Sequence, residues 1–575
     1  MTVPPVAPAV VADVLDALPP RLRKRVDASL DKVASWTVAT ESGAARAELD
    51  ADTVLTWTLH DGVLTSADDL VCGCLLAPKC LHRGIAVAAA DVSDAVVTAD
   101  EPVEAVVAEP EVRVEVREDE RAAAGELWDA CSTVLRSGAS GSGVVVRAEL
   151  LRAVHVARVA GLHRAAATGL RVASALNAAR TGASTFDRRV LTADLVDLML
   201  LCHDLRTGTG DTAVLRGTAR REYTPIGSLR LYGLCTEAVV ASSGYAGVVT
   251  HLVDDSGVLW TVPSIMPGGP ELVVAAASGP VAVGESGLSQ RALGRGGLLL
   301  SGGTGSPDRR LGAGKAVRAV SASGADWTSP PLAGLWETPL ADQVARAFAA
   351  AGQPESHRPS GDSLLFLEGT VLGAAGPAVR LAVGEGQLDL VGAGERTRAN
   401  LKVLAGATGR VLRFVARILP ERPGTAVALA VAGDLVLPAD LRHHVDLGLD
   451  VLQRSHAPGD GDVELPEPVA VGERVPAALR PLDNVLHRVT LGGRAVAAVA
   501  STGRDVAVLA GHGLTGTAAV LADLTTTSRD RQRDAFGRVV RDAGDSFPMA
   551  WLRAGVHVRE FGQAVAQRAW LAAAQ

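Results

Sequence analysis

The first hundred residues carry two kinds of hydrophobic pattern. Residues 10–36 predict one or two helices, whereas residues 53–60 (TVLTWTLH) alternate in the manner of a half-buried strand. Asp61-Gly62 is a hairpin turn signal, and a second strand is expected over 63–66. A short apolar helix is expected over 84–97. This part of the chain therefore predicts a small ββα module.

The pattern changes twice in the middle of the chain. Residues 98–118 are rich in Glu, contain Pro102 and Pro110 and lack aromatic residues, which predicts an acidic linker. Three helical stretches separated by Gly/Ser-rich breakers follow, over 119–136, 144–181 and 191–206. Short loops between helices favour a small bundle.

From about residue 207 the pattern becomes that of β-structure. Hairpins are expected over 246–262, 378–391 and 410–433, and three further strands over 486–511. Many short strands with turn signals favour barrels or sandwiches. A charge-rich helix is expected from residue 528, and a last helix ends the chain.

These patterns predict an α+β multi-domain chain. A small N-terminal ββα module and a helical segment precede β-rich barrel- or sandwich-like domains. The expected divisions are an N-terminal domain over 1–97, the linker over 98–118, a helical domain over 119–206, a β-rich domain over 207–352, and a second β-rich region with C-terminal helices over 360–575.

Composition narrows the class of protein. Of the 575 residues 48% are hydrophobic and 21% charged, which excludes disorder of the whole chain. The net charge of −8 requires any nucleic-acid contact to be local. The first 20 residues lack the basic start of a signal peptide, and no run of about 18 apolar residues occurs, so a cytoplasmic protein with no membrane contact is expected. The excess of Arg over Lys indicates a high-GC bacterial genome, on codon usage alone.

Three of the six cysteines lie within nine residues. The spacing is Cys72-x-Cys74-x5-Cys80-x-His82. Zinc takes four such ligands in a tetrahedron, and a spacer of five residues is long enough to fold the chain back on itself. The alternative is that these are ordinary buried cysteines beside an incidental histidine. Because four ligands already fill the site and no Glu follows His82 as a catalytic base, the pattern favours one closed, structural Zn²⁺.

This pattern, with a predicted hairpin before it and an apolar helix after it, resembles the SWIM-type zinc finger over about residues 50–90. The resemblance implies that Cys72, Cys74, Cys80 and His82 are the four zinc ligands of a zinc-stabilised ββα module. It also implies a DNA-binding or protein–protein interaction module. In bacteria such modules can accompany helicase or AAA-type ATPase systems, and that context is implied by the resemblance only.

Charge gives a weak indication of the partner. Residues 1–93 contain eight basic and twelve acidic residues. The basic side chains that could form a partner-binding surface flank the cluster or lie in the RLRKR run: Arg21, Arg23, Lys24, Arg25, Lys79 and Arg83. The alternative is that the run is a solvated helix start. A macromolecular partner is expected, and both protein and nucleic acid remain open.

The other motifs in the sequence give little indication of function. GHGLTG at 511–516 matches a dinucleotide-binding pattern but lacks a βαβ context, so a glycine-rich turn is expected there. Cys202-His203 are adjacent on a predicted helix and point apart, which favours a core cysteine. The sequence therefore predicts a non-catalytic zinc-binding adaptor. The alternative is an enzyme with an unrecognised active site within 207–575.

Overall fold

The structure is a computed structural model. It describes residues 3–573 except 42, 51–52, 61, 92–114, 242–243, 285, 315–316, 355–356, 442, 460–478, 500–501 and 542–543. Most of the predicted acidic linker and the end of the helix predicted over 84–97 lie outside these residues. The described chain is mixed α+β and forms two compact units, one of residues 1–219 with 478–559 and the other of 220–477 with 560–575.

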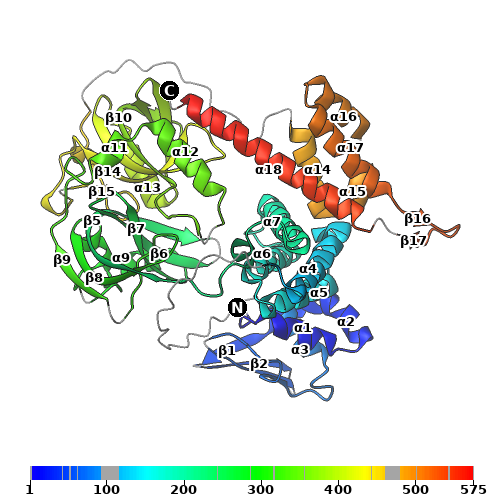
Figure 1. The fold of residues 1–575 in the computed structure, drawn as a ribbon. Coiled ribbons are helices and arrows are strands. Elements are labelled where there is room, and N and C mark those ends of the chain that lie inside the picture. The colour runs from blue at the N-terminus through cyan, green and yellow to red at the C-terminus, as the bar shows by residue number, and fades with distance from the viewer. Residues whose placement is uncertain are drawn as a thin grey trace. The chain divides into compact units, whose positions relative to one another are not determined.

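The first unit begins with a small module of helices and an antiparallel sheet (Figure 1). Its four strands pair in chain order, and a helix follows the last of them. Leu55 and Trp57 of the third strand and Ile85 of the following helix are fully buried in one shared core. The elements are α1 (Pro8–Asp16), α2 (Pro20–Val26), a 3-10 helix (Asp27–Ser35), β1 (Thr37–Glu41), β2 (Ala44–Asp50), β3 (Thr53–Thr58), β4 (Leu70–Cys72) and α3 (Leu81–Ala89).

Helices make up the rest of the first unit. A first set comprises α4 (Glu118–Ser137), α5 (Val144–Val159), α6 (His163–Thr181), α7 (Arg188–Thr207) and α8 (Thr212–Arg216). A second set comprises α14 (Arg480–Gly492), α15 (Arg494–Val499), α16 (Thr502–Gly511) and α17 (Thr515–Arg529). The hairpin β16 (Gln532–Arg533) and β17 (Val539–Arg541) is followed by α18 (Ser546–Ala573), of which the residues from 560 onward belong to the second unit. No helix among the described residues has the length and apolar character needed to cross a membrane.

The second unit contains two antiparallel sheets. The first has the order β7-β6-β5-β8-β9. Its strands and helices are β5 (Thr224–Ala241), β6 (Tyr245–Asp254), β7 (Leu259–Pro267), α9 (Leu272–Ser278), α10 (Gln290–Leu293), β8 (Gly297–Gly305) and β9 (Arg318–Ala322), followed by α11 (Gly334–Glu337) and α12 (Leu340–Ala351).

The second sheet has the order β12-β11-β10-β13-β14-β15, and β12 also pairs with β14 in parallel. Its elements are β10 (Leu364–Ala375), β11 (Ala378–Val383), β12 (Gly386–Val391), α13 (Glu395–Leu404), β13 (Val411–Ile418), β14 (Thr425–Gly433) and β15 (Val445–Asp446), with two 3-10 turns at Ala439–Leu441 and Arg454–His456.

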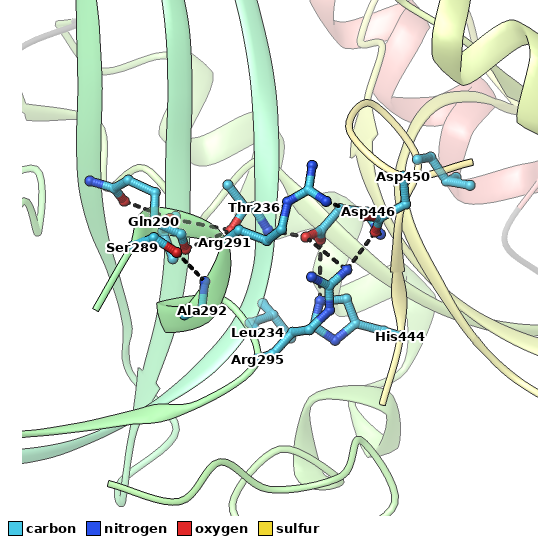
Figure 2. A network of polar contacts seen from close by, with 12 residues as sticks. Leu234, Thr236, Ser289, Gln290, Arg291, Ala292, Arg295, His444, Asp446 and Asp450 are labelled. Carbon is cyan, nitrogen blue, oxygen red and sulfur yellow. Dashed lines mark hydrogen bonds and ion pairs between the residues drawn. The ribbon is translucent and has the colours of Figure 1, made fainter. Parts of the chain in front are cut away.

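Buried charges link the two sheets of this unit (Figure 2). Asp446 of β15 accepts a hydrogen bond from the backbone N–H of Thr236 in β5 at 2.9 Å. Its carboxylate also lies 3.2 Å from His444 and 3.7 Å from Arg295, which pairs with Asp450 at 2.5 Å. Each buried acid therefore faces a cation or a backbone donor, as burial of charge requires.

A second buried pair spans the same sheets. Glu237 of β5 lies 3.0 Å from His251 in β6 and 2.5 Å from Arg417 in β13. Burial alone would raise the pKa of Glu237, but the charge of Arg417 and the hydrogen bond from His251 lower the pKa from 4.5 to about 2. The carboxylate is thus held ionised between two neighbours.

The structure confirms some predicted elements and corrects others. The three hairpins within 246–262, 378–391 and 410–433 form as β6–β7, β11–β12 and β13–β14. The helix predicted over 144–181 is two helices, which break at Gly161 (φ +85°). Where a hairpin was predicted near residue 61, His60 and Val63 form a single antiparallel bridge, and the strand that pairs with β3 is 70–72 instead of 63–66.

The C-terminal predictions were wrong in two places. Residues 486–511, expected as strands, belong to α14, α15 and α16. The buried positions of α14 are Leu482, Val485, Leu486 and Val489, which repeat at helical spacing. The helix predicted from 528 is instead a hairpin, because Asp534 accepts hydrogen bonds from two backbone N–H groups and closes a turn. These helices also join the first unit, whereas the sequence grouped them with the second β-rich region.

Candidate metal centre

Four potential ligands converge at one end of the N-terminal sheet, in residues 70–82, which we call the knuckle. Strand β4 pairs Cys72 with Leu55 of β3, and the N–H of Gly73 donates to the carbonyl of Val54 at 2.8 Å. These contacts fix the first ligand at the end of a strand.

The other ligands are placed by a turn and a helix start. The N–H of Ala77 donates to the carbonyl of Cys74 at 3.0 Å and closes the turn. Cys80 is the N-cap residue of α3, and His82 lies in the first turn of that helix. The four ligands, although spaced along the sequence, therefore come together because three short local elements place them: a strand end, a turn and a helix start.

The donor atoms fit a tetrahedral zinc ion. The Sγ atoms of the three cysteines and a ring nitrogen of His82 all lie within 4.8 Å of one another. Cys72 Sγ and His82 Nδ1 are 3.8 Å apart. Ligands about 2.3 Å from a tetrahedral zinc ion stand about 3.8 Å apart along each edge, so small shifts would complete the site. Among the described residues no other group of three such side chains has metal-binding spacing.

The thiols differ in how readily they ionise. Burial raises the pKa of Cys72 to about 12 and also raises that of Cys80. For Cys74 burial opposes ionisation, but hydrogen bonds from the backbone N–H of Leu76 and from the neighbouring thiols outweigh it and lower its pKa. A bound dication would supply the charge that makes all three thiolates favourable, with release of protons.

Arg83 is part of the knuckle's framework. The sequence placed it in a partner-binding surface, yet it is buried, with 6% of its surface exposed. One guanidinium N–H donates to the carbonyl of Pro78 at 2.7 Å, and another donates to the carbonyl of Ala67. Its charge is therefore directed inward, onto the loop that carries the cysteines, and the side chain is removed from the surface.

The other predicted cations lie on α2 or at the knuckle. Arg21, Arg25 and Lys79 are exposed, and the side chain of Lys24 lies outside the described residues. Arg23 lines a cavity of about 50 Å³ beside Glu149 and Arg152 of α5, room for about one or two waters. Helix α2 packs against α3 near Gly84, where Val26 meets the glycine. The structure thus brings the RLRKR helix beside the helix that carries His82.

Sequence reasoning missed the apolar tip of the knuckle, Leu75 and Leu76. Leu75 is 104% exposed and Leu76 64% exposed, and Val71 of the adjoining strand is 59% exposed. The signal was present: two consecutive leucines sit between ligands in a five-residue spacer that has no room to fold them inward. Exposed leucines that are grouped in this way, instead of scattered, are typical of contact surfaces.

The other chemical candidates are structural. Cys202 is fully buried, and burial raises its pKa, while His203 packs against Trp128 with ring centroids 6.4 Å apart. GHGLTG forms the end of α16, a turn and the start of α17. His444 lies 3.2 Å from Asp446 (Figure 2), and its ring stacks on Trp327 with centroids 5.2 Å apart.

Comparison with family models, with curated proteins and with solved structures finds no match for this chain.

Proposed function

We propose that the N-terminal module is a zinc-stabilised adaptor that binds a protein partner through the apolar tip. The observation that carries this proposal is the complete exposure of Leu75 beside the half-exposed Leu76. Burying two leucine side chains in a partner's groove would contribute about 1.5–3 kcal/mol each. That is enough to make the tip a binding hot spot.

Charge supports a protein partner over nucleic acid at this surface. A phosphate-binding face needs several outward cations. Arg83 is turned inward, which leaves Lys79 as the exposed cation of the knuckle. Asp68 and Asp69 precede the knuckle and add negative charge. Asp68 and Asp69 balance Lys79 and the inward Arg83, so the knuckle has no net positive charge to attract a polyanion, and an apolar contact is favoured there.

In this proposal, zinc holds the knuckle in the shape that exposes Leu75 and Leu76. The spacer between Cys74 and Cys80 contains few buried side chains, so its shape would depend on the ligands at its two ends. Metal binding in such modules is coupled to folding. We therefore expect partner binding to require zinc even though the ion makes no contact with the partner. By the SWIM resemblance, the partner would belong to a helicase or AAA-type ATPase system.

The test compares capture of one partner by matched variants. Full-length protein carrying Leu75→Asp and Leu76→Asp is compared with wild type and with Val274→Asp, an exposed apolar residue of α9 (64% exposed). The captured proteins are quantified by mass spectrometry. A partner held by wild type and by the Val274 variant, and lost from the tip variant with its zinc retained, supports the proposal. Equal capture by the tip variant overturns it.

A further inference from the structure

The C-terminal helices of the first unit carry a surface that is independent of the knuckle. Helices α16 and α17 pack against each other and are joined by the three residues His512-Gly513-Leu514. Gly513 has φ +77°, a conformation that favours glycine and reverses the chain in a short turn. Helix α15 packs against α17. A short loop between two helices that pack against each other is the construction of an αα-hairpin, and it leaves one face of the second helix for contact with a ligand.

One face of α17 is exposed along its whole length. Buried positions such as Leu521 and Leu524 face the other helices. The opposite stripe, at spacings of four and three residues, contains small side chains that are exposed or half-buried and ends in an arginine: Thr515, Ala519, Ala522, Thr526 and Arg529. None of these is acidic. The nearby Asp523 is directed to Arg553 of α18, 3.6 Å away. Small Thr and Ala side chains would allow this face of the helix to lie close to the floor of a DNA groove, where they can contact base edges.

The hairpin that follows α17 adds positive charge. Residues 529–541, which we call the arm, contain five Arg and two Asp, a net charge of +3 in a chain whose net charge is −8. Of the two acids, Asp530 pairs with Arg541 at 3.2 Å, and Asp534 accepts the backbone N–H groups of Phe536 and Arg538. The arm is therefore a local cationic feature of the kind that a polyanion requires.

An aromatic side chain stands at the tip of the arm. Phe536 is 90% exposed, and Val540 in the second strand is 67% exposed. The turn is shaped by Asp534 and by Gly537 at φ +80°, and it directs Phe536 away from the strands. Apolar side chains flanked by arginines can insert between base steps of a duplex. Exposure of Phe536 contributes little to the stability of the hairpin, because a two-stranded hairpin alone is at best marginally stable in water.

We propose that α16, α17 and the arm form a binding site for duplex DNA. The exposed stripe of α17 enters the major groove, and the arm reaches the adjacent minor groove, with arginines on the flanking phosphates and Phe536 against the bases. The favoured ligand is a polyanion with grooves because an exposed helix stripe without acidic side chains is followed directly by an arginine-rich hairpin with an aromatic tip.

The test measures binding of full-length protein to a fluorescent 30-base-pair duplex of mixed sequence, by anisotropy at several salt concentrations. The arm variant carries Arg531→Ala, Arg538→Ala and Arg541→Ala, three changes at exposed arginines of the arm. The control carries three changes at exposed arginines elsewhere: Arg188→Ala, Arg189→Ala and Arg396→Ala. Loss of about three phosphate contacts should lower the slope of log affinity against log salt by about 2.7 in the arm variant.

A second variant separates stacking from charge. Phe536→Ala should weaken duplex binding at unchanged salt slope, because it removes an apolar contact with the bases and no charge. Circular dichroism and thermal melting establish that each variant is folded. Cys80→Ser should retain duplex binding, so failure of the zinc adaptor proposal would leave this one standing. Absence of duplex binding by wild type at 50 mM salt overturns the proposal. So does equal weakening by the arm and control variants, or binding to anionic lipid vesicles in place of DNA.

Discussion

Replacing Arg83 by methionine tests whether this residue holds the knuckle together or faces a partner. The substitution keeps the length of the buried side chain and removes the two donors to Pro78 and Ala67. Hydrogen bonds from a charged group contribute about 1.5–3 kcal/mol each. Against that loss, the buried Nε of Arg83 has no partner, and removing it relieves a cost of about 1–3 kcal/mol. Two bonds contribute about 3–6 kcal/mol together, and subtracting the relief of about 1–3 kcal/mol leaves an expected destabilisation of the knuckle of about 2–3 kcal/mol.

That loss should appear directly as weaker zinc binding. If metal binding and ordering of the knuckle are coupled, about 2–3 kcal/mol corresponds to about a 30- to 150-fold rise in the zinc dissociation constant. The assay is competition with a chromophoric chelator at pH 7. Lys79→Met is the control, because it removes an exposed cation of the same loop and should leave the zinc affinity unchanged. Wild-type zinc affinity in Arg83→Met, with only partner binding lost, would refute the structural role and restore the residue to a binding surface.

Two further predictions concern stability. Arg417 and His251 hold Glu237 ionised and lower its pKa from 4.5 to about 2. The ionised side chain should therefore add about 3 kcal/mol to the free energy of unfolding above pH 4.5, and this contribution should be lost as the pH falls towards 2. Glu237→Gln should flatten this part of the stability profile when denaturation is measured from pH 5 to 2. Gly84→Ala places a Cβ 2.7 Å from Leu18 and should lower the free energy of unfolding by about 1–3 kcal/mol. Gly125→Ala, in α4 with no atom within 4 Å of the new Cβ, should raise it by about 0.5–1 kcal/mol. Urea denaturation measures both variants, and a change of the same sign in the two would contradict this reasoning.

The metal cluster was predictable because its determinants are local. Four ligands within eleven residues need only a strand end, a turn and a helix start to converge, and all three lie inside the same short segment. The hairpins were predictable for a similar reason. In 246–262 the DDSG turn lies between two alternating runs, and Asp254 forms the turn by accepting from Ser256 and Val258.

The errors arose where distant packing decides the outcome. Residues 486–511 contain many Val and Gly residues, which favoured strands, but α14 is held helical by burial of its apolar face against α7. In 528–541 the alternating charges suited a surface helix, and the turn at Asp534 prevailed. The inward direction of Arg83 could not be predicted because its acceptor on Ala67 lies sixteen residues away, across a strand and a loop.

The measurement that tests the central claim most directly is metal content per chain. Protein purified without added zinc is analysed by elemental analysis beside Cys80→Ser, which removes one of the four predicted ligands. We expect one zinc per wild-type chain, lost in the variant, while the rest of the first unit retains its helical circular dichroism. A folded, reduced wild-type protein without zinc would contradict the metal centre, and with it the adaptor function proposed for the knuckle.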